Sequence, residues 1–356
     1  MAKNVLLVNN GYPSELYPHY TTYIRSIEEC IEASGLGVDK LVISYDRPIT
    51  PLYKLRQYLR FWIKCLTIRT DCDIIYINHL PFALPIILNP FIARKKMIVH
   101  WHGNDLAGSG KFVRIASRFL ARFVAKAHNI VPSNYFNRLL HARFAKAPLR
   151  VSVSPSGGVD TSRFVPAKTD RKNFVIGYAS SLSREKGADI FLYLLRNRSE
   201  IERLTGRTIE FHYIKYGSEL NSYLPELAKF DEKAVIGFDR MPKTDMPTFL
   251  NSTDLILFPS LRRLSESLGL VALEAMSCGV PVVAHNICAF PEYIKPGLSG
   301  ELVEHSGSGQ QQCRAFLDAV VKAVNNIHSY SPRQVVEGGY SQTSVTAFYR
   351  TLFQSL

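Results

Sequence analysis

Short apolar runs alternate with amphipathic stretches along the chain, and this pattern predicts strands that alternate with helices. The first run, residues 4–9, is followed by a turn at Gly11 and by helical spacing over residues 20–34. Strand, turn and helix in this order begin a doubly wound α/β unit. The other strands that the pattern predicts in the first half cover residues 41–45, 73–78, 96–101, 129–131 and 151–155.

The same pattern starts again after residues 166–172, a polar and proline-marked stretch that we interpret as an interdomain linker. A strand over residues 173–179, a helix to about residue 203 and a strand over residues 235–241 follow. A length of 356 residues suits two domains better than one. We therefore predict two doubly wound, Rossmann-like α/β domains, residues 1–165 and 166–343.

Residues 259–284 combine a polar loop, a glycine, a helical pattern and an apolar strand. The start of such a helix leaves backbone amides unpaired, and with the helix dipole these amides can hold a phosphate or diphosphate. Glu266 lies before this possible phosphate site, and Glu274 lies after it. A carboxylate repels phosphate, so the hydroxyls of a sugar or ribose are its natural partners. The alternative is that both glutamates are solvated residues at a helix end.

These residues resemble the paired-glutamate signature of retaining glycosyltransferase family 4, whose members have the GT-B fold of two Rossmann-like domains facing across a cleft. The resemblance implies that Glu266 contacts the hydroxyls of the donor sugar and that Glu274 binds the ribose of the nucleotide. It also implies that the amides of Gly269 and Leu270 hold the diphosphate. The whole segment that it assigns to donor binding is Glu266, Ser267, Leu268, Gly269 and Leu270.

His102 follows a predicted strand, at the position where parallel sheets place their ligand sites. The run from His102 to Asp105 resembles the family motif whose histidine lies beside the reacting sugar, although an isolated histidine there is commonly structural. His100 shares a strand face with His102, which could suggest a metal, but no convincing third ligand is present and we predict no metal site. Gly11 is predicted to approach the diphosphate, unless it is an ordinary turn glycine.

Lys186 stands just ahead of a predicted helix, where it could neutralise a departing diphosphate. The family normally carries an arginine five positions earlier, and this chain has Ser181 there. We predict that Arg184 supplies the missing cation. The alternative is a weakened or altered donor site.

The positive charge is concentrated in the first half of the chain. Residues 1–165 carry 22 Lys and Arg against 10 Asp and Glu, whereas residues 166–356 carry 21 against 20. Residues 54–64 and 112–126 interleave cations with large apolar side chains, which favours an anionic membrane surface as partner. No nucleic-acid-binding motif is present, and we predict no nucleic acid partner. Two amphipathic helices with a solvated basic face and an aromatic core face are the alternative.

No secretory signal is evident at the start, and the six cysteines form no C-x-x-C pair, which suggests reduced thiols in the cytoplasm. We predict a peripheral protein on the inner face of the cytoplasmic membrane. The resemblance adds that the C-terminal helix, residues 344–356, joins the first domain.

The resemblance implies a retaining, metal-independent hexosyltransferase, and we predict no cofactor. Its donor is a UDP- or GDP-sugar, and its acceptor is a lipid-linked glycan of cell-surface polysaccharide or lipopolysaccharide synthesis. His102, Lys186 and Glu266 are the predicted catalytic residues. The alternatives are a glycoside hydrolase, which the placement of both glutamates along one helix disfavours, and a noncatalytic GT-B scaffold or membrane-binding subunit.

Overall fold

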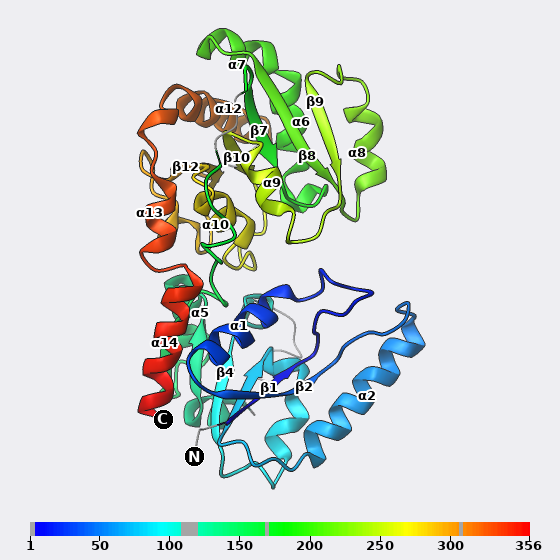
Figure 1. Ribbon diagram of the computed structural model, residues 1–356, viewed down its shortest axis with the longest axis vertical. Helices are drawn as coiled ribbons and strands as arrows, with labels where there is room; N and C mark the ends of the chain where they lie inside the picture. The colour runs from blue at the N-terminus through cyan, green and yellow to red at the C-terminus, as the bar shows by residue number, and fades with distance from the viewer. Residues whose placement is uncertain (1–3, 108–119, 168–170, 306–308) are drawn as a thin grey trace. The chain divides into compact units, whose positions relative to one another are not determined.

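The computed structural model describes residues 4–107, 120–167, 171–305 and 309–356. The chain divides into two compact units (Figure 1): residues 1–158 with 342–356, and residues 159–341. The chain enters and leaves the second unit at neighbouring points, because Val159 bridges Ser341 and its amide donates to the carbonyl of Tyr340, 2.8 Å away. The sequence-predicted boundary after residue 165 lies inside the second unit.

The first unit contains a six-stranded parallel sheet with the order β2-β1-β3-β4-β5-β6. Its strands are β1 Asn4–Asn9, β2 Gly37–Val42, β3 Ile74–Asn78, β4 Lys96–His100, β5 His128–Val131 and β6 Arg150–Val153. The strand predicted over residues 41–45 begins earlier, at Gly37, and ends at Val42. It is an edge strand with the polar residues Asp39 and Lys40, so its start lacks the apolar run expected of a buried strand.

Helices cover both faces of this sheet. They are α1 Thr22–Ala33, α2 Pro51–Thr67, η1 Leu80–Phe82, η2 Leu84–Leu88, α3 Asn104–Ala107, α5 Asn134–Arg143 and α14 Gln342–Ser355. Successive strand residues point to opposite faces, so Val5 packs with α1 and α14 while Leu6 packs in the cluster that includes Phe61 of α2. The C-terminal helix α14 is part of this unit, and the hydroxyl of Tyr349 lies 2.6 Å from that of Tyr76.

The predicted basic helix over residues 112–126 lies partly outside the described residues. Phe112, Arg114, Ile115, Arg118 and Phe119 belong to the part that is not described. Residues 120–126 are helical, and Leu120 and Val124 are buried in the core of the first unit. Within the described residues, no helix is both long and apolar enough to span a bilayer.

The second unit contains another six-stranded parallel sheet, with the order β12-β11-β10-β7-β8-β9. Its strands are β7 Phe174–Tyr178, β8 Ile209–Lys215, β9 Val235–Asp239, β10 Leu255–Phe258, β11 Val282–His285 and β12 Gly300–Val303. Counted from β9, this is the order 3-2-1-4-5-6 of doubly wound nucleotide-binding sheets. The strand order reverses between β7 and β10, and ligands bind beyond the carboxyl ends of the strands at such a switch point.

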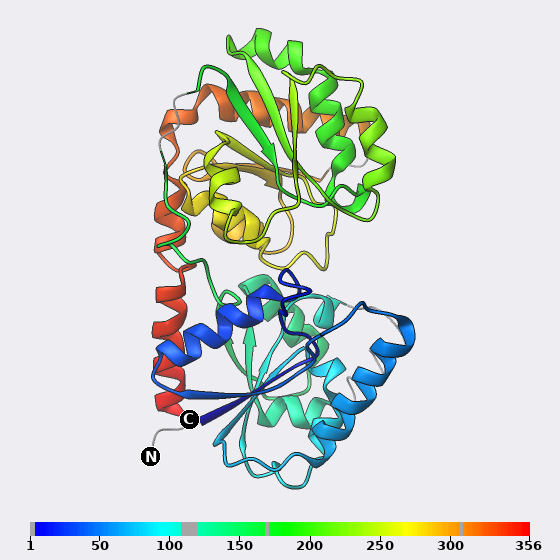
Figure 2. The same ribbon diagram turned by 45° about the vertical axis from the view of Figure 1, so that its right-hand side comes forward.

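The helices of the second unit are η3 Arg184–Lys186, α6 Ala188–Arg196, α7 Arg198–Thr205, α8 Leu220–Leu227, α9 Met246–Asn251, α10 Leu270–Ser277, α11 Phe290–Tyr293, α12 Gly309–Asn325, η4 Ile327–Ser329 and α13 Pro332–Glu337. Helices α6 and α12 share one hydrophobic core with the sheet (Figure 2). The single helix predicted to about residue 203 is interrupted at Asn197. The side-chain amide of Asn197 donates to the carbonyl of Tyr193, 2.8 Å away, which competes with helix continuation.

Candidate functional site

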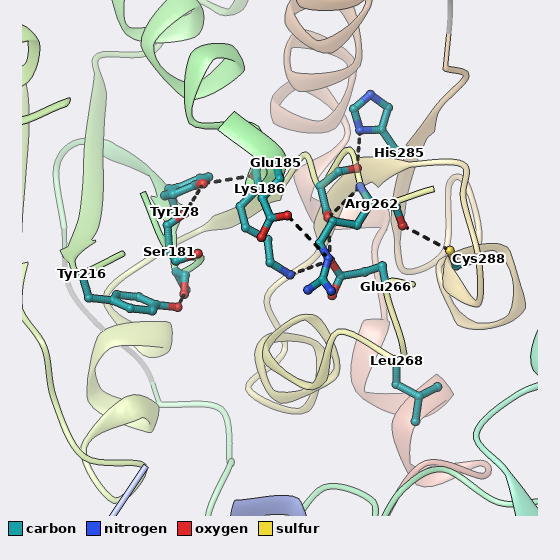
Figure 3. A network of polar contacts seen from close by, with 12 residues as sticks. Tyr178, Ser181, Glu185, Lys186, Tyr216, Arg262, Glu266, Leu268, His285 and Cys288 are labelled. Atoms are coloured by element: carbon teal, nitrogen blue, oxygen red, sulfur yellow. Dashed lines mark hydrogen bonds and ion pairs between the residues drawn. The ribbon is translucent and has the colours of Figure 1, made fainter. Parts of the chain in front are cut away.

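Two loops at the switch point of the second sheet bring Lys186 and Glu266 together (Figure 3). Lys186 follows β7 and Glu266 follows β10, and Lys186 Nζ lies 2.6 Å from Glu266 Oε2. The hydroxyl of Ser260 donates to the same oxygen at 2.5 Å. The side chains of Lys186 and Glu266 are only 17% and 8% exposed, respectively. A carboxylate and a cation predicted separately are therefore one preorganised ion pair.

The loop after β7 holds Lys186 through contacts of its backbone. The Tyr178 hydroxyl donates to the carbonyl oxygens of Ser181 and Lys186, at 3.0 and 3.1 Å (Figure 3). Gly187 has φ of +77°, and a Cβ there would lie 2.2 Å from the carbonyl oxygen of Pro259. The two loops thus approach each other backbone to backbone, and only glycine fits at their contact.

Helix α10 begins directly after Glu266, Ser267 and Leu268. Its N-cap is Gly269, which has φ of +58° and no side-chain capping hydrogen bond. The amides of the first turn have no intrahelical acceptors, so this end of α10 can hold an anion. The Tyr293 hydroxyl donates to the carbonyl of Leu268 at 2.5 Å and fixes the turn ahead of the helix. Leu270 opens the helix, as the sequence predicts.

Glu274 lies one turn into α10 and is buried, with Lys243 Nζ 3.5 Å from its Oε1. Burial raises the pKa of Glu274, and the positive charges of Lys243 and Arg163 oppose that rise. The sequence analysis missed Lys243. The position of Lys243 could have indicated it, because Lys243 follows β9, one of the strands whose carboxyl ends line this edge of the sheet.

Arg184 lies on η3 with 79% of its side chain exposed, and its Nε is 3.3 Å from Asp189 Oδ2. Ser181 occupies the position of the family arginine, and its carbonyl accepts the Tyr178 hydrogen bond. Arg262 lies beside the Lys186–Glu266 pair, with its Nε 4.0 Å from Glu185 Oε2 (Figure 3). The role of Arg184 as the replacement cation stays a prediction.

His102 lies in the first unit, just beyond the carboxyl end of β4. Its Nε2 is 2.8 Å from Asn78 Oδ1, and its Nδ1 is 3.4 Å from the hydroxyl of Ser156. Because the amide oxygen of Asn78 can only accept, Nε2 carries the proton and Nδ1 is an acceptor. The backbone amides of His102 and Gly103 donate to the buried Asp105 carboxylate at 2.9 to 3.1 Å, which shapes the turn.

Three histidine rings lie close together at this edge of the first sheet, tilted relative to one another. The ring of His102 lies 4.2 Å from that of His100 and 4.6 Å from that of His79, centre to centre. Burial lowers the pKa of His102 well below its usual value, and it lowers the pKa of His100 to about 3. His100 and His102 are therefore neutral near pH 7. No group of three metal-binding side chains occurs among the described residues.

His79 was not singled out in the sequence. It adopts a left-handed backbone with φ of 49°, and its Nδ1 lies 3.3 Å from Asp105 Oδ2. Its Nε2 lies 2.5 Å from the Tyr23 hydroxyl. The available signal was positional, because His79 follows β3 just as His102 follows the neighbouring strand β4.

Gly11 follows β1 in the first unit. A Cβ at Gly11 would lie 2.6 Å from Cε1 of Tyr20, so the ring of Tyr20 already accounts for a glycine here. The predicted contact of Gly11 with a diphosphate stays a prediction.

The second unit matches a known family. Residues 159–322 match the family model described as "Glycosyl transferases group 1". The D-inositol 3-phosphate glycosyltransferase of Paenarthrobacter aurescens is 30% identical over 211 residues, which cover 55% of this chain and 47% of that protein. The chain spans about half, or less, of the length of the curated relatives it matches.

Solved structures extend the likeness to both units. Sucrose-phosphate synthase from Thermosynechococcus elongatus has a TM-score of 0.73 at 14% identity, with 99% of this chain and 100% of that chain covered. Anabaena HepE in complex with UDP and glucose has a TM-score of 0.67 at 19% identity, with the same coverage. At these identities the likeness shows the fold, and the predicted GT-B fold of two Rossmann-like α/β domains is confirmed.

Proposed function

We propose that this protein is a retaining, metal-independent hexosyltransferase that uses a UDP- or GDP-sugar. Its acceptor is a lipid-linked glycan at the cytoplasmic face of a membrane, in the synthesis of cell-surface polysaccharide or lipopolysaccharide. The observation that carries the proposal is the Lys186–Glu266 pair at the switch point between β7 and β10, next to the uncapped start of α10. The glycosyltransferase family match over residues 159–322 supports it.

The main work of such a site is electrostatic. When the bond between sugar and diphosphate breaks, negative charge develops on the departing diphosphate. The ammonium group of Lys186 and the first amides of α10 would stabilise that charge. Glu266 is already fixed by Lys186 and Ser260, so it can accept hydrogen bonds from sugar hydroxyls without a further ordering cost. Arg184 would supply a second positive charge for the departing diphosphate.

Glu274 and His102 complete the proposed assignment. Glu274 would accept hydrogen bonds from the ribose, with Lys243 compensating its buried charge. His102 is neutral, and its Nδ1 would accept a hydrogen bond from a hydroxyl of the donor sugar. A neutral imidazole can orient a hydroxyl, and unlike a protonated one it does not attract the diphosphate away from Lys186.

The lipid-linked acceptor is supported by the surface of α2. Five large aliphatic side chains recur every three or four residues and are 40 to 77% exposed, which places an apolar stripe in the solvent: Leu52, Leu55, Leu59, Ile63 and Leu66. Basic residues flank the stripe, namely Lys54, Arg56, Arg60 and Lys64. An exposed apolar stripe with basic neighbours suits the headgroup boundary of an anionic membrane. The alternative interpretation predicts that the aromatic side chains of this helix face the core. Phe61 is buried, whereas Trp62 is 38% exposed.

The proposal is tested by screening nucleotide-sugars with a thermal-shift assay, followed by mass analysis of the products formed on lipid extracts. Glu266→Ala and Lys186→Ala, made separately, should each reduce sugar transfer about 100-fold or more. Lys229→Ala is the matched control, since it removes an exposed lysine of the same unit. Transfer at the wild-type rate in both variants would show that the Lys186–Glu266 pair is not the catalytic site and would remove the observation that carries the proposal. Donor binding without any transfer would favour the noncatalytic scaffold.

A further inference from the structure

The first unit contains a cavity of about 530 Å³ at the amino edge of its sheet. Lys96, His128 and Arg150, which are the first residues of β4, β5 and β6, line it together with Leu88 of η2. Neighbouring parallel strands begin at the same edge of a sheet, so these residues converge although they are far apart in sequence. The volume lies within the range of ligand sites.

The lining is strongly cationic. Five basic side chains border the cavity: Lys95, Lys96, Arg122, Lys126 and Arg150. No aspartate or glutamate side chain lines it, and none of the five cations forms an ion pair with a carboxylate elsewhere in the described part of the chain. Cations without a side-chain carboxylate partner around a concave site attract an anion, and phosphate oxygens suit both lysine and arginine.

Apolar side chains border the same cavity. Leu88 lines it and is 72% exposed, and Phe91, three residues further along the chain, is 48% exposed. Helix η2, which carries Leu88, packs on α2, the helix with the exposed aliphatic stripe. A free inorganic anion needs no apolar surroundings, whereas a lipid phosphate carries an apolar chain beside its charge.

We propose that this cavity binds the phosphate headgroup of an anionic phospholipid, while Leu88 and the aliphatic stripe of α2 enter the apolar boundary of the membrane. The proposal rests on the membrane-facing role proposed above for the first unit and not on sugar transfer. The acceptor's own phosphate is a poorer occupant. His102 lies beyond the carboxyl end of β4 and the cavity at its amino end, roughly 15 Å apart along the strand.

Vesicle binding of the full chain separates headgroup recognition from general charge attraction. One set of phosphatidylcholine vesicles contains phosphatidylglycerol, and a second contains oleate at the same surface charge. Wild-type protein should bind the phosphatidylglycerol vesicles more tightly. In the variant Lys126→Gln/Arg150→Gln, partitioning onto these vesicles should fall roughly tenfold or more, and the preference over oleate vesicles should disappear.

Two further variants serve as controls. Arg25→Gln/Arg47→Gln removes two exposed arginines of the same unit, which form ion pairs with Glu29 and Asp46, respectively. This variant should keep the preference for phosphatidylglycerol. Leu55→Gln/Leu59→Gln removes part of the apolar stripe, and it should weaken binding to both vesicle types alike. Equal losses in the cavity variant and the arginine control, or equal wild-type binding to both vesicle types, would overturn the proposal.

The lipid source is checked with soluble ligands. Dihexanoyl phosphatidylglycerol should shift the NMR signals of His128 and should bind at least tenfold more tightly than inorganic phosphate. If inorganic phosphate binds as tightly as the short-chain lipid, the site is a general anion site and the lipid proposal is wrong. Donor binding by the cavity variant should equal that of the wild type, because none of the proposed donor residues lines the cavity. His102 and Gly11 follow the carboxyl ends of β4 and β1, and the others lie in the second unit. Failure of the transferase proposal is therefore detected separately.

Discussion

Both units carry their candidate site residues at the carboxyl ends of strands near the switch point of a sheet, but the electrostatics of the two sites differ. In the second unit, Lys186 pairs with Glu266, and Lys243 with Glu274. In the first unit, the strand order reverses between β1 and β3, and nearby lies a cluster of tilted histidine rings, those of His79, His100 and His102. A charged site suits a diphosphate that gains charge during the reaction. The neutral imidazoles of His100 and His102 suit hydroxyls, which must be oriented and not neutralised.

The largest contrast concerns the glycines that follow the first strand of each unit. In Gly187→Ala, the new Cβ would meet the backbone of Pro259 in a left-handed conformation, so we expect a loss of about 3 kcal/mol or more in unfolding free energy. In Gly11→Ala, the new Cβ meets only side-chain atoms, those of the Tyr20 ring and of Thr21, which can shift more easily than backbone, and the expected loss is about 1 kcal/mol.

The two tryptophans, Trp62 and Trp101, both belong to the first unit, which makes the measurement specific to each unit. Denaturant unfolding followed by circular dichroism reports both units, whereas tryptophan fluorescence reports the first. Gly187→Ala should shift the circular dichroism transition and leave the fluorescence transition in place. A larger effect of Gly11→Ala would contradict the proposed backbone contact.

The second contrast is the response of the first unit to acid. The folded pKa of His100 is about 3 against an ordinary value of 6.5, so below pH 6.5 the unfolded chain binds a proton that the folded chain does not. Stability is therefore fully present above about pH 6.5 and falls as the pH drops towards 3, by up to about 1.4 kcal/mol per pH unit for this group.

Tryptophan fluorescence at pH values from about 6.5 to about 5 measures this slope before most carboxylates titrate. His100→Gln should make the slope shallower, whereas the exposed His141 on α5 is a control whose replacement should leave it nearly unchanged. An unchanged slope in His100→Gln would mean that the buried histidine cluster does not control the acid response.

The smallest effect concerns Glu274, whose pKa shifts in the opposite direction. Burial raises this pKa, so the unit loses stability as the pH rises from 4.5 through the folded pKa. Glu274→Gln removes a buried charge that the proposed function requires, and it should raise the unfolding free energy of the second unit at pH 7 by about 1 kcal/mol while weakening donor binding.

Glu185→Gln provides the comparison for this substitution, because Glu185 is exposed at the rim of the same site. The circular dichroism transition should move little in that variant. If Glu274→Gln instead destabilised the unit, the pair with Lys243 would be a net stabilising interaction, and the contrast between a functional and a structural carboxylate would be lost.

Local signals predicted the secondary structure of residues 259–284 well. A glycine and a proline delimit the helix and strand of residues 259–284, and the structure has them as α10 and β11. Signals of this kind act over one or two turns of chain, so they need no knowledge of the fold. Two predictions from apolar periodicity were wrong. The limits predicted for β2 were wrong because β2 is an edge strand with a polar start. The single helix predicted to about residue 203 was wrong because a side-chain hydrogen bond of Asn197 interrupts it.

Contacts between distant segments could not be predicted in the same way. Lys186 and Glu266 are 80 positions apart, and the approach of their loops depends on the adjacency of β7 and β10. The contact of His79 with Asp105 depends likewise on the pairing of β3 with β4. Hydrophobic patterns specify that strands exist, whereas strand order decides which of their ends meet.

The sequence by itself determined the alternating strands and helices, the glycine-led turn into α10 and the two carboxylates beside it, since steric limits and backbone dipoles act within a few residues. Only the tertiary structure decided that the first residues of β4, β5 and β6 surround one cationic cavity and that the aliphatic face of α2 remains in solvent. Both depend on which segments pack side by side, and that is a property of the whole fold.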